Sequence, residues 1–191
     1  MVGVATEDLE RRIRACTLCG LYRTRKNAVP GEGPYDAKVV FVGEAPGYNE
    51  DIQGRPFVGS AGKFLNELLQ SAGLKRGDVY IGNVVKCRPP QNRAPADDEI
   101  ETCTTHYLQK QITMIKPRLV VALGRTAARA LLGKQVIMGR EHGTLLDCIY
   151  ADVKFKLFVT YHPAAALYGA GAKQGLQADF KKLGQIVESM T

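Results

Sequence analysis

Short apolar runs that alternate with helical patterns limit what this chain can fold into. The runs 38–43, 79–85 and 119–123 are rich in valine and too short for helices, so each predicts a buried strand. Helices are predicted at 6–15, at 61–72, from Asp97 or Asp98 to before Pro117, at 126–132 and at 174–189. Two more strand-like segments, 144–150 and 153–160, are expected to pair through a turn at Ala151-Asp152. This alternation predicts an α/β fold whose mainly parallel sheet is covered by helices on both faces.

The composition indicates one domain with an anionic partner. Of the 191 residues 45% are hydrophobic, and no repeat, low-complexity tract or linker divides them, so we expect a single domain over 1–191. The formal net charge of +7 favours nucleic acid as the partner. Residues 1–10 lack the apolar segment of a signal peptide, and no apolar run approaches the roughly 20 residues that span a bilayer. We therefore expect a soluble, cytoplasmic protein with no membrane partner.

The cysteines suggest a metal site. Cys16 and Cys19 form a C-x2-C pair, whose spacing lets two thiolates of one turn bind one ion or one edge of a cluster. Cys87 and Cys103 could complete four ligands, and the proline-rich surroundings of Cys87 are unlike a core. The four fit either a structural zinc ion or an iron–sulfur cluster, attached to the domain as an appendage. The alternative is that the distant pair are small buried hydrophobic residues, as we expect of Cys148.

Polar side chains are predicted at the carboxyl ends of the strands, where ligands bind in such folds. The first strand leads into Glu44, the second delivers Asn83, and the last delivers His162. The third leads into 124–126, where a helix N-terminus and an arginine could bind phosphate. An acid, an amide and a histidine suit recognition of a planar heterocycle and stabilisation of charge as a bond breaks. The structural alternatives are an ion pair for Glu44, a loop cap for Asn83 and a backbone hydrogen bond for His162.

The motifs of the chain occur in a recognisable order. They are Gly43-Glu44-Ala45-Pro46-Gly47, Gly54-Arg55-Pro56-Phe57-Val58-Gly59, Asn83 ahead of Lys86-Cys87-Arg88-Pro89-Pro90-Gln91-Asn92-Arg93, and His162-Pro163. Together with the four cysteines they resemble the family 4 uracil-DNA glycosylases, from Cys16 to beyond His162. The resemblance implies a three-layer α/β/α sandwich with a mainly parallel sheet, and a [4Fe-4S] cluster on Cys16, Cys19, Cys87 and Cys103. It also implies hydrolysis of the N-glycosidic bond of deoxyuridine in single- and double-stranded DNA, which releases uracil and leaves an abasic site.

The same resemblance implies roles for the residues of the pocket. Phe57 would stack on the flipped uracil, Asn83 would read its Watson–Crick edge, and His162 would stabilise negative charge at uracil O2. The backbone of Gly43, Glu44 and Ala45 would line the pocket. Glu44 and Glu50 are both candidates for the catalytic carboxylate near the sugar. Glu44 is preferred by its place in the motif. Glu50 could instead crowd the position of the methyl group of thymine.

DNA contacts outside the pocket are expected from two segments. Backbone amides at the helix start around Ser60 would hold phosphates, while Leu167 and Tyr168 are candidate wedges that fill the gap left by a flipped base. Packing against the last helix is the alternative for the wedge pair. We expect a monomer, and the residues do not decide whether it docks on a replication clamp. The competing functions are a non-catalytic nucleic-acid-binding module with a four-cysteine metal site, and an enzyme that hydrolyses small nucleotides.

Overall fold

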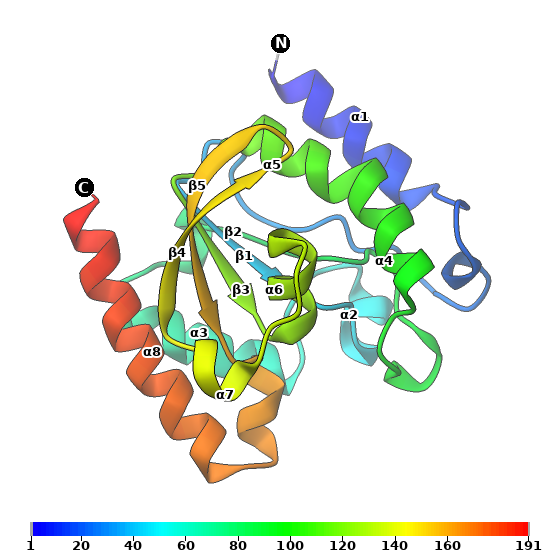
Figure 1. The fold of residues 1–191 in the computed structure, drawn as a ribbon. Helices are drawn as coiled ribbons and strands as arrows, with labels where there is room; N and C mark the ends of the chain where they lie inside the picture. Colours follow the sequence, from blue (N-terminus) through cyan, green and yellow to red (C-terminus); the bar gives the residue numbers. More distant parts are fainter. Residues whose placement is uncertain (1, 191) are drawn as a thin grey trace.

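A five-stranded sheet forms the centre of the computed structural model, which describes residues 2–190 (Figure 1). The strands are β1 (Val39–Gly43), β2 (Tyr80–Asn83), β3 (Leu119–Leu123), β4 (Thr144–Tyr150) and β5 (Val153–Thr160), in the order β2-β1-β3-β5-β4. All neighbours are parallel except β4 and β5, which form an antiparallel hairpin at one edge. The predicted mainly parallel sheet is therefore confirmed.

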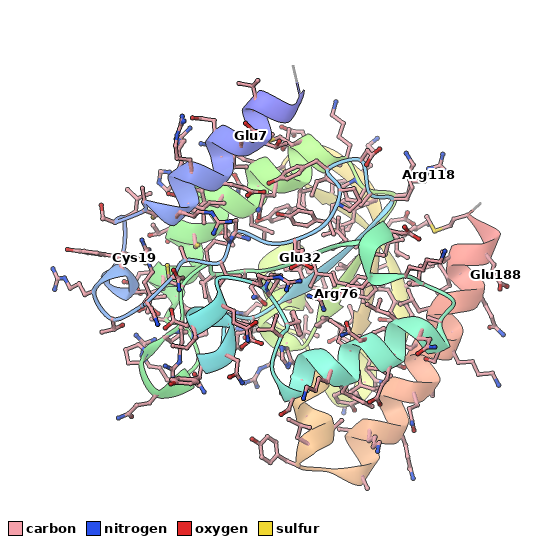
Figure 2. The ribbon with its side chains drawn as sticks, turned by 180° about the vertical axis from the view of Figure 1, so that it is seen from behind. Glu7, Cys19, Glu32, Arg76, Arg118 and Glu188 are labelled. Atoms are coloured by element: carbon pink, nitrogen blue, oxygen red, sulfur yellow. The ribbon has the colours of Figure 1, made fainter. Side chains whose placement is uncertain are left out.

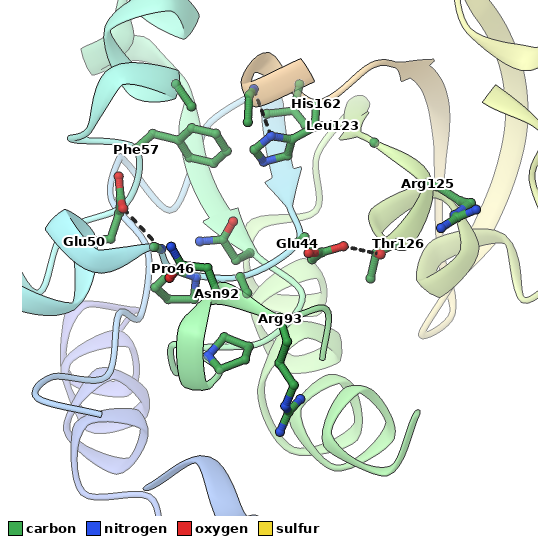
Figure 3. A pocket seen from close by; sticks show the side chains of 17 residues that line it. Glu44, Pro46, Glu50, Phe57, Asn92, Arg93, Leu123, Arg125, Thr126 and His162 are labelled. Carbon is green, nitrogen blue, oxygen red and sulfur yellow. Dashed lines mark hydrogen bonds between the residues drawn. The ribbon is translucent and has the colours of Figure 1, made fainter. Parts of the chain in front are cut away.

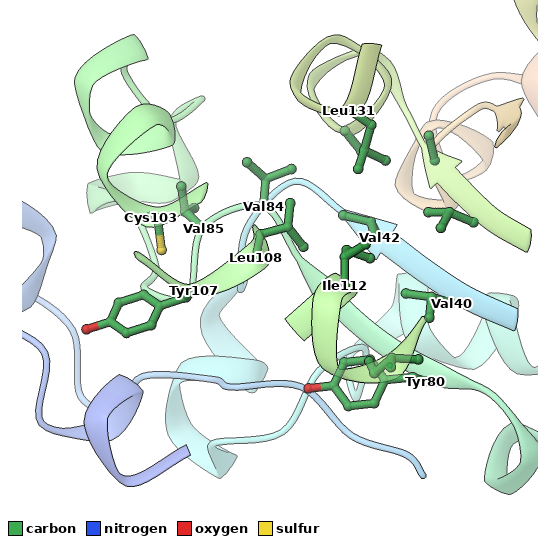
Figure 4. Close-up of a cluster of buried hydrophobic side chains, with 14 of the residues drawn as sticks. Val40, Val42, Tyr80, Val84, Val85, Cys103, Tyr107, Leu108, Ile112 and Leu131 are labelled. Atoms are coloured by element: carbon green, nitrogen blue, oxygen red, sulfur yellow. The ribbon is translucent and has the colours of Figure 1, made fainter. Parts of the chain in front are cut away.

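Two apolar clusters cover the two faces of the sheet, because alternate side chains of a strand point to opposite sides. Val40 and Val42 belong to one cluster, and Val39 and Phe41 to the other. The first cluster also contains residues of α1 (Val2–Arg14), α5 (Gln109–Ile115) and α6 (Arg125–Leu132), as Figure 4 shows in part. The second contains residues of α3 (Ser60–Ser71) and α8 (Ala170–Ser189). The fold is thus an α/β sandwich, with helices on either side of the sheet.

Several boundaries differ from the sequence prediction for local reasons. The second strand ends at Asn83, two residues early, and the chain then turns away with its next two amides bonded to the carbonyls of Gly43 and Glu44. The helix predicted from Asp97 consists of α4 (Asp97–Cys103), a π-helical turn (Thr104–Leu108) and α5. The first and last helices begin at Val2 and Ala170, four residues before their predicted starts, because glycine-containing first turns masked the helical pattern.

Short helices and turns complete the connections. Sequence patterns did not predict α2 (Tyr48–Gln53) or α7 (Met138–Glu141), which are too short to show a period. Turns of 3₁₀ helix lie at Gly20–Arg23, Arg76–Asp78, Pro90–Asn92 and Pro163–Leu167. Ala151 and Asp152 both have positive φ, as the predicted two-residue hairpin turn requires. Among the described helices, none is long and apolar enough to cross a membrane.

Candidate active site

A pocket of about 360 Å³ lies at the carboxyl ends of the parallel strands (Figure 3). Gly43 is the register partner of Asn83, and Leu123 is the partner of Thr160, so the segments that follow these strands meet here. The residues that line it are Glu44, Ala45, Pro46, Gly47, Glu50, Phe57, Ala61, Asn83, Pro89, Asn92, Arg93, Leu123, Gly124, Arg125, Thr126, His162 and Ala164. The sheet therefore brings the predicted acid, amide and histidine into one pocket.

Phe57 forms one wall of the pocket and faces His162. The two rings are 5.6 Å apart between centroids, with 29° between their planes, and Phe57 is only 6% exposed. Its φ of 51° is unusual for a bulky residue, so the surrounding contacts must hold it in place. Arg76 does so by donating to the carbonyls of Pro56 (2.7 Å) and Phe57 (3.3 Å), and it lies beside Glu32 (Figure 2).

Gly43 lies behind this wall and is not among the lining residues. A Cβ at this position would lie 2.5 Å from Asn83 Oδ1 and 2.7 Å from Phe57 Cζ, closer than real Cβ atoms approach other atoms. Gly62 plays a similar part on α3, because a Cβ there would lie 1.9 Å from the carbonyl oxygen of Phe57. The two glycines therefore allow Asn83 and Phe57 to take their places in the pocket.

Asn83 supplies a buried polar group that no described residue satisfies. Its side chain belongs to a residue that is 2% exposed, and Oδ1 has no hydrogen-bond partner within residues 2–190. Leaving such an acceptor unpaired costs about 1–3 kcal/mol, so its persistence calls for a reason. The loop cap proposed as its structural alternative would have supplied a partner. The geometry instead leaves Oδ1 available to a donor on a ligand in the pocket.

His162 is held as a neutral hydrogen-bond donor. Its Nδ1 accepts the backbone N–H of Ala164 at 3.1 Å, which places the ring proton on Nε2. Burial lowers the pKa of His162 below its ordinary value of 6.5, and the nearby carboxylates Glu44 and Glu50 oppose this shift without cancelling it. The backbone hydrogen bond that we considered as an alternative thus exists, but it leaves the other ring nitrogen free to donate into the pocket.

The two glutamates occupy different environments. Glu44 Oε2 accepts the hydroxyl of Thr126 at 2.5 Å, and the partner is not a lysine or arginine as in the ion-pair alternative. Glu50 accepts three backbone amides: Val58 and Gly59 at Oε1, each at 2.9 Å, and Gly47 at Oε2 at 3.1 Å. Glu50 therefore ties α2 to the segment that carries Phe57, whereas Glu44 is oriented by a single hydroxyl.

Sequence reasoning missed part of the pocket wall. Thr126 was considered only for phosphate binding, and Pro89, Asn92 and Arg93 were noticed only as part of a motif. Their signal was their position in the segments that follow the carboxyl ends of β2 and β3. Arg93 is held by a two-pronged ion pair with Glu99, with both N–O distances 2.8 Å.

The predicted DNA-contact residues lie outside the pocket lining. Ser60 is the exposed first residue of α3, and its neighbour Ala61 lines the pocket. Leu167 and Tyr168 lie at the end of the 3₁₀ turn next to His162 and are 49% and 91% exposed. Such exposure argues against packing of the Tyr168 ring on α8, which was the alternative to a wedge.

The four cysteines predicted as ligands line a second, mostly apolar cavity, shared with Leu21, Val85, Lys86, Thr102 and Tyr107. All are free thiols. Burial raises the pKa of the Cys103 thiol to about 12, so a bare thiol there would stay protonated unless a cation were bound. Cys148 lies elsewhere, buried, with its thiol directed at the carbonyl of Leu131.

Nitrogen donors surround three of these sulfurs. Arg25 donates to Cys87 Sγ at 2.9 Å, the amide of Lys86 approaches Cys103 Sγ at 3.3 Å, and that of Leu18 approaches Cys16 Sγ at 3.5 Å. Amide and guanidinium donors to sulfur are typical of thiolates bound to a cluster. Convergence of the four on one cavity fits a thiolate-bound group. As placed within residues 2–190, no set of three or more His, Cys, Asp or Glu side chains is arranged to hold a metal ion.

Known proteins are similar to this chain over most of its length. Residues 30–184 match the family model described as the Uracil DNA glycosylase superfamily. The chain is 45% identical over 184 residues to the Type-4 uracil-DNA glycosylase of Archaeoglobus fulgidus, a match that covers 94% of this chain and 92% of that protein. Its identity to the Type-4 enzyme of Saccharolobus solfataricus is 46% over 182 residues, or 93% and 84% of the two chains. Similarity to the Type-5 uracil-DNA glycosylase of Thermus thermophilus is lower, 38% over 119 residues, or 54% and 53% of the two chains.

Proposed function

The chain belongs to the uracil DNA glycosylase superfamily, and on this premise we propose how its pocket removes uracil from DNA. The protein is a uracil-DNA glycosylase, a hydrolase that cleaves the N-glycosidic bond of deoxyuridine in DNA repair. Its substrate is uracil-containing DNA. Activity on both single and double strands, flipping of the base, a monomeric state and action inside the cell are further parts of the proposal.

The unpartnered Oδ1 of Asn83 is the observation that carries the assignment of the base. Uracil presents N3–H, a donor, next to O4, an acceptor, and the amide of Asn83 offers the complementary pair. Cytosine presents an acceptor at N3 and a donor at N4, so it would leave the buried amide facing like groups. Sites that hydrogen-bond their substrate in this way reject analogues strongly, because the buried partner is left unpaired. Asn83 would therefore select uracil over cytosine.

The two facing rings and the segment after β1 would hold the base. Phe57 would stack on uracil, and the backbone of Glu44 and Ala45 would border it, while Gly43 stays behind the wall of the pocket. Glu50, fixed by three amides, has the rigidity needed to block the extra methyl group of thymine. A fixed obstacle suits this task, because a methyl group distinguished by attraction alone is worth only about 1–3 kcal/mol.

His162 and Glu44 would stabilise the opposite charges that develop as the bond breaks. Electrons flow toward the base, so negative charge grows at uracil O2, and the Nε2–H of a neutral His162 can donate to it. Positive charge grows on the sugar, where the carboxylate of Glu44, oriented by Thr126, would stabilise it or position the attacking water. A single donor to a developing oxyanion is typically worth about 10²–10³ in kcat. The contacts of Glu50 favour positioning over catalysis.

We propose that Cys16, Cys19, Cys87 and Cys103 hold a [4Fe-4S] cluster. When bound, the cluster would cross-link the segment after α1 to the loop after β2 and the end of α4, which is a structural role. Outside the pocket, amides at Ser60 would bind phosphate, and Leu167 and Tyr168 would enter the space left by the flipped base. No feature of these residues bears on a replication clamp.

The test is base release from oligonucleotides that differ at one base. Uracil, thymine or cytosine is placed in otherwise identical single and double strands, and abasic sites are revealed by alkali. We expect cleavage only at uracil. Asn83→Asp should lower kcat/KM by about 100-fold or more while binding to uracil-free DNA persists, and the exposed Gln177→Ala should match the wild type. Equal loss of DNA binding and cleavage in Asn83→Asp would refute the role of Asn83, and absence of cleavage by iron-loaded wild type would refute the function.

A further inference from the structure

An exposed aromatic ring and an arginine form a pair beside the pocket. Tyr48, the first residue of α2, is 58% exposed, and the guanidinium of Arg88 lies 5.1 Å from the centre of its ring. Tyr48 directly follows the lining residue Gly47, and Arg88 directly precedes the lining residue Pro89. The pair therefore lies at the rim of the pocket, although neither residue belongs to its lining.

Local contacts hold the arginine without neutralising its charge. Arg88 Nε donates to Asn92 Oδ1 at 2.7 Å, and Asn92 itself lines the pocket. Within the described residues, no carboxylate pairs with Arg88. A fixed cation next to an open aromatic ring matches the two parts of a nucleotide, because the ring can stack on a base and the cation can approach a phosphate.

We propose that Tyr48 and Arg88 form a stacking subsite for the nucleobase adjacent to the excised uridine. This rests on the proposed function, because the subsite takes a DNA strand whose uridine occupies the pocket. Stacking on an aromatic ring is sequence-tolerant, since every base has a π-face, so the subsite would strengthen binding without restricting the flanking sequence. Its contribution should be largest for single strands, whose bases are not already stacked in a duplex.

The subsite is tested by changing Tyr48 in the protein and the neighbouring base in the substrate, separately and together. The substrates are single strands in which uridine has normal neighbours, or an abasic linker on its 5′ or its 3′ side. Tyr48→Ala should lower kcat/KM about tenfold on the normal strand, mainly through KM, and have no effect on one of the two linker strands. Tyr48→Phe keeps the ring and should match the wild type. Tyr22→Ala serves as the control, because Tyr22 is also exposed beside an arginine but does not adjoin the pocket lining.

Two results would overturn the subsite: no loss in Tyr48→Ala, or the same loss on all three strands. The wild type serves to separate the two levels of the proposal. If the wild type cleaves the normal strand but the effect of Tyr48→Ala does not depend on the neighbouring base, the subsite is refuted and the glycosylase function stands. If the wild type cleaves none of the strands, the proposed function itself fails.

A buried lysine carries a second, independent inference. Lys86 is 1% exposed, and its ammonium donates to the backbone oxygen of Asn83 (2.7 Å) and to Oε1 of Gln111 (2.6 Å). Gln111 is itself oriented, because its Nε2 donates to the carbonyl of Pro30 and to the hydroxyl of Tyr80, both at 2.8 Å. Within residues 2–190 no carboxylate pairs with Lys86, although buried lysines usually need a counter-charge.

The cysteine cavity explains this charge. Lys86 lines the cavity, precedes Cys87 and donates its own amide toward Cys103. We infer that Lys86 is a positioning residue, whose charge balances the thiolates of the bound cluster and whose ammonium holds the main chain of Asn83 against the pocket. The lysine would then link the cluster to recognition of the base, without touching either the base or the sugar.

Two variants with different readouts test this link. Lys86→Met should release iron to a chelator several times faster than the wild type, and it should reduce kcat/KM on uracil strands about tenfold with binding to uracil-free DNA unchanged. Gln111→Met removes one acceptor but keeps the lysine, so it should retain iron and lose only part of the activity. Unchanged iron release in Lys86→Met would refute the charge balance. Unchanged kinetics in both variants would refute the positioning of Asn83.

Discussion

The close approach of Asn83 and Phe57 at Gly43 predicts that a single methyl group will damage the pocket. In Gly43→Ala the new Cβ would lie 2.5 Å from Asn83 Oδ1 and 2.7 Å from Phe57 Cζ, well inside the 3.4 Å at which ordinary contacts begin. Neither neighbour can yield freely. Phe57 is fixed by Arg76 and by its contact with Gly62, and Asn83 ends a strand paired with β1. The amide or the ring must therefore shift within the pocket.

Gly43→Ala should reduce the rate of uracil removal more than it reduces the stability of the fold. A displacement of about 1 Å in a group that orients the substrate can cost about 100-fold, so kcat/KM for uracil strands should fall about 10- to 100-fold. Overpacking should cost about 1–3 kcal/mol, and each kcal/mol lowers the melting temperature of a domain of this size by about 2–4 °C. Steady-state cleavage and thermal unfolding measure the two effects.

Gly77→Ala is the matched control, because a Cβ at Gly77 would meet no atom within 4 Å and the residue has no positive φ. It should behave like the wild type in both assays. Gly43→Ala activity within about twofold of the wild type would show that the contacts at Gly43 do not constrain the pocket, and the roles inferred for Asn83 and Phe57 would be refuted.

Further predictions separate the roles of the other residues. Glu44→Gln should lower kcat about 100-fold or more and leave the melting temperature unchanged. Glu50→Gln should reduce the free energy of unfolding by about 1–3 kcal/mol, because it weakens three hydrogen bonds from backbone amides. Equal melting temperatures of the two variants would contradict a catalytic role for Glu44 and a positioning role for Glu50. The pKa of His162 is lower in the folded protein than its ordinary value of 6.5. Below pH 6.5 the unfolded chain therefore binds more protons at this residue than the folded protein does. As a result, the free energy of unfolding falls as the pH falls from 6.5 through the folded pKa. Denaturant titrations should show a flatter decline over this window in His162→Gln, and an identical decline would refute the assignment. Cys103→Ser should lose iron and melt at a lower temperature, which iron analysis and calorimetry would detect, whereas Cys148→Ser should retain its iron.

Patterns within single segments predicted much of the fold. The valine-rich runs around Val40 and Val120 became β1 and β3, because a short apolar run can be buried on both faces only inside a covered sheet. The hairpin turn at Ala151-Asp152 was predicted as well. Residues that continue a regular pattern were the most predictable. The short helices α2 and α7 were not predictable, because six and four residues are too few to show a helical period.

In the candidate site, too, the sequence predicted the positions of residues better than their contacts. The predicted strand ends placed Glu44, Asn83 and His162 together, since parallel strands bring their carboxyl ends to one edge. The family resemblance added Phe57. Their separate tasks depended on contacts that join residues far apart in the chain. Thr126 orients Glu44 across 82 positions, and the amides that occupy Glu50 come partly from a loop eight and nine positions away. Residue type alone left these two carboxylates equivalent.

The sequence by itself determined the α/β architecture, the four-cysteine set and the family, because each depends on residue types at fixed intervals along the chain. The tertiary structure decided which groups are free to act. It left Oδ1 of Asn83 unpaired, put the ring proton of His162 on Nε2 and occupied Glu50 with backbone amides. Hydrogen bonds and burial belong to the packed molecule, since a donor is free or engaged only when its neighbours in space are known.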